Sequence, residues 1–306
     1  MLGRSRRLRS PGARRPALVW AAVLLAFAVG VALGGGVLAR FTTDSDLKNL
    51  RTKVDQLEQS NAALTDRARA ADAYAGAAAP STLGRSLAGV PVLLFVAPSA
   101  DRGDVQRISD RLTQGGGTVA GTVTLTADLY AEDKSERLRG VVDNAVPSGV
   151  SLDDALVDPR ARAGDLLGAV LLAKGAAAAP STGRTDALAA LKQAGFVDFS
   201  GPTVPGARAA VIVTGGTVPG ERAGEGQGIG RLAAALSRHG DGAVLAGRSG
   251  SSQGAGPIVV VRQDSGLSAA LATVDDADTV VGQVSTALAL AQATRGDVRA
   301  YGTGVR

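Results

Sequence analysis

The chain has 306 residues, of which 45% are hydrophobic and 3% aromatic, so its core must be built from aliphatic side chains. The absence of cysteine excludes disulfides, zinc–thiolate sites and thiol catalysis. Six arginines within residues 1–16 account for the net charge of +5, so the rest of the chain is nearly neutral and its main domain lacks the basic surface of a nucleic-acid-binding protein.

The first predicted element is a transmembrane helix at residues 17–39. This run contains no charged residue, and about 20 apolar residues span the hydrocarbon core. The arginines of residues 1–16 predict a basic cytoplasmic tail, with the rest of the chain outside the cytoplasm. A signal peptide cleaved after residues 37–39 is the alternative, but its apolar part would cover only about 7 to 15 residues. We therefore expect a single-pass membrane anchor.

Small residues recur every fourth position within this helix. They form a face stripped of bulk, which lets another helix approach closely. The predicted helix-packing face consists of Ala22, Ala26, Gly30 and Gly34.

A coiled coil is predicted directly after the membrane, at residues 44–72. Apolar residues alternate three and four apart, and Asn61 at an a position favours a parallel two-stranded register. The alternative is one amphipathic helix packed on its own domain. We expect a homodimer whose seam contains Leu47, Leu50, Val54, Leu57, Asn61 and Leu64. Residues 73–86, rich in Ala and containing Pro80, are predicted to form a hinge.

Residues 87–306 are predicted to form an extracytoplasmic α/β domain. Strands are expected at residues 90–96, 118–125, 209–214, 243–246 and 258–262, and helices after Asp101, at 229–238 and at 280–293. Alternating strands and helices predict a Rossmann-like, mostly parallel sheet covered by helices.

Seven segments, taken in order, resemble the actinobacterial copper transport protein family known as MctB-like. They are residues 25–34 (LAFAVGVALG), 116–125 (GGTVAGTVTL), 163–168 (AGDLLG), 211–216 (VIVTGG), 231–236 (RLAAAL), 273–276 (TVDD) and 301–304 (YGTG). The resemblance implies a cell-envelope protein of copper homeostasis or efflux, with copper as the transported ion. It also implies links to envelope maintenance and cell separation.

The residues themselves predict no resident cofactor and no copper site within one chain. Cys and Met select Cu(I) and imidazole suits Cu(II), yet the chain has no Cys, one Met at its start and one His. A dimer can bring two copies of His239 together. We favour instead a role for His239 at the C-terminal end of a helix dipole.

Other motifs give weak signals. Residues 226–230 (GQGIG) resemble an anion-binding turn but lack the third glycine, so we expect a flexible loop. Asp275, Asp276 and Asp278 suit either a hard cation or a helix cap. Residues 247–251 (GRSGS) depart from the nucleophile elbow at the last position. We therefore predict no catalytic residues and no enzyme.

Two functions remain open. The resemblance implies a component of copper homeostasis that acts as a dimer or with an envelope protein partner. We adopt the copper role. The alternative, which the residues also fit, is a non-enzymatic, dimeric, membrane-anchored scaffold or regulator of envelope maintenance or cell separation.

Overall fold

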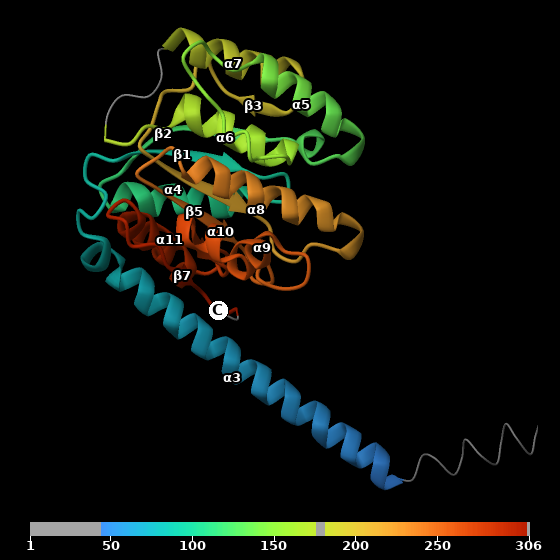
Figure 1. Ribbon diagram of the computed structural model, residues 1–306. Helices are drawn as coiled ribbons and strands as arrows, with labels where there is room; N and C mark the ends of the chain where they lie inside the picture. The colour runs from blue at the N-terminus through green and yellow to red at the C-terminus, as the bar shows by residue number, and fades with distance from the viewer. Residues whose placement is uncertain (1–43, 176–180, 305–306) are drawn as a thin grey trace, which may run out of the picture. The chain divides into compact units, whose positions relative to one another are not determined.

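A computed structural model describes residues 44–175 and 181–304 of the chain (Figure 1). The predicted basic tail, transmembrane helix and helix-packing face all lie outside these ranges. Within them, no helix is both long and apolar enough to cross a membrane. The chain divides into two compact units between Ala68 and Arg69.

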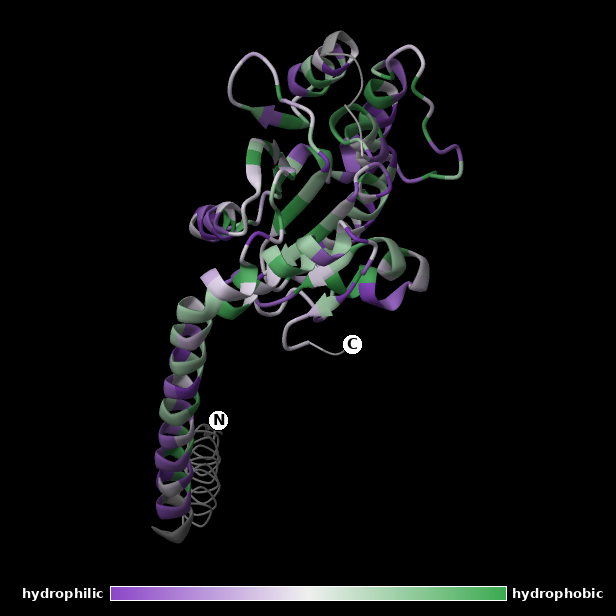
Figure 2. Ribbon diagram, turned by 90° about the vertical axis from the view of Figure 1, so that its left-hand side faces the viewer, coloured by the Kyte–Doolittle hydropathy of each residue, from purple (hydrophilic) through white to green (hydrophobic). Residues whose placement is uncertain are grey.

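The first described element is the long helix α3 (Asp44–Leu83). Its amino-terminal part contains the predicted coiled-coil seam, and four large apolar residues of that seam are at least half exposed. The exposed fractions are 59% for Leu50, 50% for Val54, 64% for Leu57 and 58% for Leu64. Figure 2 shows hydrophilic and hydrophobic stretches mixed along this helix.

The prediction of a hinge at residues 73–86 was wrong for most of its length, because α3 continues to Leu83. Alanine is the strongest helix former, and Ala79 and Leu83 are buried in the domain core. This burial offsets the cost of Pro80, which lies inside the helix and lacks a backbone donor. A turn replaces the helix only at residues 84–89.

The domain is built on a seven-stranded sheet with the order β3-β2-β1-β4-β5-β6-β7. All neighbours run parallel except β3, which is antiparallel to β2. The first six positions follow the doubly wound Rossmann order. The strands are β1 (Pro91–Val96), β2 (Thr118–Leu125), β3 (Val197–Phe199), β4 (Ala209–Thr214), β5 (Gly242–Gly247), β6 (Ala272–Val274) and β7 (Ala300–Tyr301).

Helices cover both faces of this sheet (Figure 1). Successive residues of β1 enter opposite cores, because side chains alternate across a strand. Leu93 and Phe95 join one core, and Val92 and Leu94 join the other. The helices are α4 (Arg102–Gln114), α5 (Ser135–Asn144), α6 (Pro159–Leu171), α7 (Ser181–Gln193), α8 (Ala223–Ser237), α9 (Pro257–Gln263), α10 (Ser265–Ala270) and α11 (Val280–Ala293).

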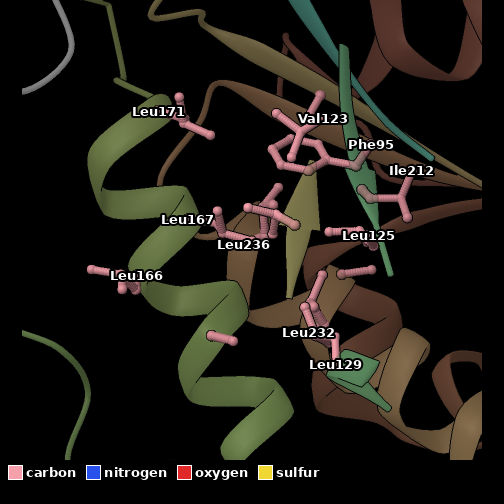
Figure 3. Close-up of a cluster of buried hydrophobic side chains, with 14 of the residues drawn as sticks. Phe95, Val123, Leu125, Leu129, Leu166, Leu167, Leu171, Ile212, Leu232 and Leu236 are labelled. Atoms are coloured by element: carbon pink, nitrogen blue, oxygen red, sulfur yellow. The ribbon is translucent and has the colours of Figure 1, made fainter. Parts of the chain in front are cut away.

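The larger core lies between the sheet and helices α6 and α8. Figure 3 shows Phe95 and Ile212 from the strands facing Leu167 of α6 and Leu232 and Leu236 of α8. All five residues are fully buried, and each stabilises the fold by about 1.5–3 kcal/mol relative to an exposed position.

Several predicted boundaries are confirmed. The carboxylate of Asp101 accepts a hydrogen bond from the Asp104 backbone N–H, which caps α4. Gly116 then adopts a φ of +86°, a conformation that ends the helix before β2 and that side chains disfavour. The helix predicted at residues 280–293 matches α11.

The strand predicted at residues 258–262 is wrong, because these residues lie in α9. Pro257 occupies the first turn of that helix, where its missing N–H has no cost. Ile258 and Val261 are buried three residues apart, which is helical spacing. The β-branched composition favoured a strand, but this burial pattern is that of a helix.

The flexible loop predicted at residues 226–230 is also wrong, because these residues belong to α8. The glycines allow close helix packing. A Cβ on Gly226 would lie 2.0 Å from the carbonyl oxygen of Ala255, and one on Gly230 would lie 2.9 Å from that of Pro257. The glycine-rich composition by itself did not indicate this role in helix packing.

Candidate functional site

The carboxyl ends of β1, β4, β5 and β6 meet at one edge of the sheet. The chain builds the sheet outward from β1 through β2 to β3 on one side, then returns to β4 on the other side of β1 and continues to β5 and β6. The β1/β4 boundary is therefore a switch point. Open α/β sheets bind ligands in the crevice at such a point. In this fold a ligand site is therefore expected at this edge.

The chain's own loops fill this switch point. The Ser99 hydroxyl oxygen, after β1, accepts a hydrogen bond from the Gly215 N–H, after β4, at 3.2 Å. A Cβ on Gly215 would lie 2.6 Å from the Ser99 carbonyl oxygen, and one on Gly216 would lie 2.6 Å from that of Ser249. The paired glycines thus bring three loops into backbone contact where a nucleotide would otherwise enter.

An ion-pair network closes the same edge. Nε of Arg248, after β5, lies 3.2 Å from a carboxylate oxygen of Asp104, and Nη2 of Arg107 lies 2.6 Å from the other oxygen. Asp104 is fully buried in the first turn of α4, so these contacts compensate for the loss of water around its charge. The network ties the loop after β5 to α4.

The elbow-like residues 247–251 take part in packing and loop closure. Ser249 donates from its backbone N–H and its hydroxyl group to one oxygen of Asp278, at 2.8 and 3.0 Å. Ser251 is fully buried beside Gly247. The hydroxyl group of Ser249 is therefore engaged with a carboxylate.

The aspartates of residues 275–278 are not the helix cap that we considered. Thr279 caps α11 instead, because its hydroxyl oxygen accepts a hydrogen bond from the Gly282 N–H.

Asp275 forms a buried ion pair with Arg262, with Nη1 and the carboxylate oxygen 2.7 Å apart. Its carboxylate also accepts hydrogen bonds from the backbone N–H groups of Thr303 and Gly304, at 2.7 and 2.8 Å. Asp275 thus holds the last described residues against the sheet.

The environment of Asp275 favours its charged form. Burial raises the pKa of this carboxyl group, but the hydrogen bond from Ser252, the charge of Arg262 and the two backbone donors together bring the pKa below its usual value. Arg262 also donates to the Tyr301 carbonyl oxygen at 2.7 Å. The β-branched residues before Arg262 favour a strand, so the sequence pattern did not indicate this role of the arginine.

Asp276 has the opposite electrostatic environment. Burial, together with the negative charges of Asp275 and Asp278, raises its pKa to about 6. Among the described residues its Oδ1 has no hydrogen-bond partner. The folded state therefore holds the proton of this carboxyl group more tightly than the unfolded chain does.

We predict that Asp276→Asn stabilises the protein at pH 7.5 and has little effect near pH 4. The folded pKa lies above the unfolded value, so the stability contribution of Asp276 is present at low pH and is lost as the pH rises through about 6. We expect a gain of about 1–2 kcal/mol after allowing for solvent screening. Urea unfolding at both pH values measures it, and an equal gain at both would contradict the titration of Asp276.

His239 contacts a buried carboxylate. Its Nε2 lies 2.6 Å from an oxygen of Asp165 on α6, whose other oxygen accepts from the Asp153 N–H at 2.7 Å. Burial raises the pKa of Asp165, but the hydrogen bonds from His239 and Asp153 and the charges of His239 and Arg238 lower it below its usual value. His239 and Asp165 are 74 positions apart in the chain, so no local sequence pattern indicates this contact.

This pair does not form a metal centre with its neighbours. Across residues 44–175 and 181–304, no three His, Asp or Glu side chains converge as metal ligands would. A Cβ on Gly168 would lie 2.6 Å from Cδ2 of His239, so the ring packs tightly on the α6 backbone. The contact locks the end of α8 onto α6.

The fold and this edge define an α/β protein of doubly wound strand order, preceded by a long helix, whose switch point is filled by its own loops. The family described as "Copper transport outer membrane protein, MctB" matches residues 12–306, and the chain belongs to this family. The resemblance seen in the seven segments is therefore confirmed.

Curated relatives match over nearly their whole length. The "Copper transporter MctB" of Mycobacterium tuberculosis (strain ATCC 25618 / H37Rv) is 37% identical over 304 residues, which cover 95% of this chain and 96% of the relative. The "Copper transporter MctB" of Mycobacterium leprae (strain TN) is 35% identical over 303 residues, with the same shares.

Proposed function

We propose that this protein is a cell-envelope component of copper homeostasis, with copper as the ion that is moved. The observation that carries this proposal is the family match over residues 12–306, supported by relatives that are named copper transporters. We further propose a non-enzymatic role, which the filled switch point and the engaged Ser249 hydroxyl group support.

We propose that the chain acts without a copper site of its own. Copper sites in proteins draw on Cys, Met and His, and this sequence supplies no Cys, one Met and one His. The single His is held by Asp165. Copper handling would then depend on a partner protein or on the assembled oligomer.

The proposed membrane topology follows from the sequence. Residues 17–39 would cross the membrane once, with the arginines of residues 1–16 in the cytoplasm and the α/β domain outside. The family description names an outer membrane protein, which supports membrane association.

We propose a parallel homodimer formed through α3. The exposed stripe of Leu50, Val54, Leu57 and Leu64 supports it, because a coiled coil buries such a stripe against a second copy. Asn61 would set the register at some cost in stability.

The dimer predicts a specific crosslink. Because the chain has no native cysteine, Leu57→Cys is expected to form an intermolecular disulfide under mild oxidation. The d positions of a parallel pair face each other, whereas Gln59→Cys, two residues further on and outside the seam, should stay monomeric on a non-reducing gel. Equal crosslinking at both positions in membranes would contradict the seam.

Copper tolerance tests the proposed function. Deleting the protein should increase sensitivity to copper without increasing sensitivity to detergent, and both the native chain and His239→Ala should restore growth. A folded His239→Ala variant that fails to restore tolerance would place the histidine in the copper path. Parallel sensitivity to copper and detergent would instead favour the scaffold that maintains the envelope.

Metal titration gives a second, independent result. The full chain in phosphatidylcholine nanodiscs is expected to show no tight binding of Cu(I) or Cu(II) by calorimetry, because soft ligands are absent. Tight binding that disappears in His239→Ala would overturn the proposal that the chain lacks its own site.

A further inference from the structure

A cavity of about 370 Å³ opens on the domain surface, and its lining contains none of the switch-point residues described above. It lies between α6, α8, α10 and the loop before α6. This volume is within the range of small-ligand sites, which are mostly apolar with a few polar groups at fixed positions. The lining residues are Ala155, Leu156, Val157, Asp158, Ala161, Arg231, Ala235, Arg238 and Leu267.

Small residues make the hollow. Ala161 on α6 and Ala235 on α8 are both buried, and each presents only a methyl group to the cavity. Leu156, Val157 and Leu267 supply larger aliphatic surface. Val157 is 75% exposed, one of the few large apolar residues of the domain that face solvent. The lining contains no aromatic side chain, which suits a flexible aliphatic chain better than a planar ring.

Two arginines on one side of α8 supply the positive groups of the lining. Nη1 of Arg231 lies 2.7 Å from Asp158, and Nη1 of Arg238 lies 2.7 Å from Asp153. In the hydrogen bonds found across the described residues, each guanidinium group uses this one nitrogen. Both side chains are 46% exposed, so Nε and Nη2 remain available to a further acceptor.

The neighbouring carboxylates are already engaged. Asp158 caps α6 through one oxygen, which accepts from the Arg160 and Ala161 N–H groups, and pairs with Arg231 through the other. Asp153 accepts from the Ala155 N–H and from Arg238. These bonds hold the two guanidinium groups in place before a ligand arrives, which reduces the entropy lost on binding.

We propose that this cavity binds a single-chain aliphatic carboxylate, such as a medium-chain fatty acid. The acyl chain would lie against Ala161, Ala235 and Leu267. The carboxylate would accept from the free N–H groups of Arg238 or Arg231, because guanidinium forks match carboxylate geometry. This inference is independent of the copper role.

Photo-crosslinking on the full chain in phosphatidylcholine nanodiscs tests the site. The probe is decanoic acid with a diazirine in its chain. We expect labelled peptides to contain residues 155–161 or 231–238, and unlabelled hexanoate, octanoate and decanoate to compete about fourfold better per added methylene. Labelling that spares these peptides would overturn the proposal.

Variants separate the cavity from non-specific partition into lipid. Ala235→Leu fills the cavity and should reduce labelling of these peptides at least tenfold. The control is Arg222→Gln, which changes an exposed arginine in the turn before α8. Arg222 does not line the cavity, so this variant should leave labelling unchanged. Arg238→Gln, a surface change, should weaken competition by decanoate about tenfold while that by decanol is unaltered. Equal competition by decanol and decanoate in the native chain, or full labelling of Ala235→Leu, would overturn the proposal.

Discussion

Gly164→Ala is expected to destabilise the protein by about 2 kcal/mol. Gly164 lies on α6 where that helix crosses α8, and an added Cβ would lie 2.2 Å from the Leu232 carbonyl oxygen. Because this neighbour is backbone, the helices must separate, at a cost of about 3 kcal/mol. Alanine recovers only about 1 kcal/mol of helix propensity, so the packing term decides the sign. Urea unfolding of the full chain measures the change.

Gly140→Ala is the matched control. It is also a helical glycine, on α5, but among the described residues no atom beyond its chain neighbours and its own helix backbone lies within 4 Å of the added Cβ. The same propensity gain should therefore appear without a clash, and we expect stability to rise by up to about 1 kcal/mol. If both variants change stability in the same direction, the α6–α8 contact does not depend on a glycine.

The sequence was sufficient for the strands at the centre of the sheet. The runs at residues 90–96 and 209–213 are continuously apolar, and as β1 and β4 they are covered on both faces of the sheet. Such runs are typical of parallel strands covered by helices. A hydrophobic sequence pattern reports burial directly, and these elements were predicted for that reason.

Tertiary contact decided the elements that were missed. Residues 226–230 are rich in glycine, but close neighbours hold them in α8. Pro80 predicted a break, yet burial of Ala79 and Leu83 keeps α3 helical beyond it. In each case local propensity was overruled by packing that no local pattern encodes.

The site contacts could not be predicted because they join distant residues. His239 meets Asp165 across 74 residues, and Arg248 reaches Asp104 from a different loop. Four of the seven segments that carried the family resemblance nevertheless meet in two pairs. Residues 163–168 pack on residues 231–236, and Asp275 binds Thr303 and Gly304. The resemblance therefore marks contacts that hold the fold together.

Asp275→Asn is expected to cost about 3–5 kcal/mol, the largest loss that we predict. Its ion pair with Arg262 is buried, with 0% and 7% of the two side chains exposed. Removing the carboxylate charge leaves the guanidinium group uncompensated in the core. It also weakens acceptance from the Thr303 and Gly304 N–H groups, so amide exchange should accelerate at residues 300–304. Urea unfolding and hydrogen exchange of the full chain measure both effects.

The exposed ion pair of Arg299 and Asp297 separates the effect of burial on stability from the effect of charge. Its nitrogen and oxygen lie 2.8 Å apart, close to the 2.7 Å of the buried pair, but 60% and 47% of the side chains are exposed. Asp297→Asn should therefore change stability far less than Asp275→Asn does, because water and salt screen an exposed pair. The lowered pKa of Asp275 adds a pH signature, because the stability it contributes is complete above the usual aspartate pKa and is lost as the pH falls through its own lower value. Asp275→Asn should remove this loss of stability at acid pH, whereas Asp297→Asn should keep it. Equal losses of unfolding free energy in the two variants would mean that burial does not set the strength of the Asp275–Arg262 pair.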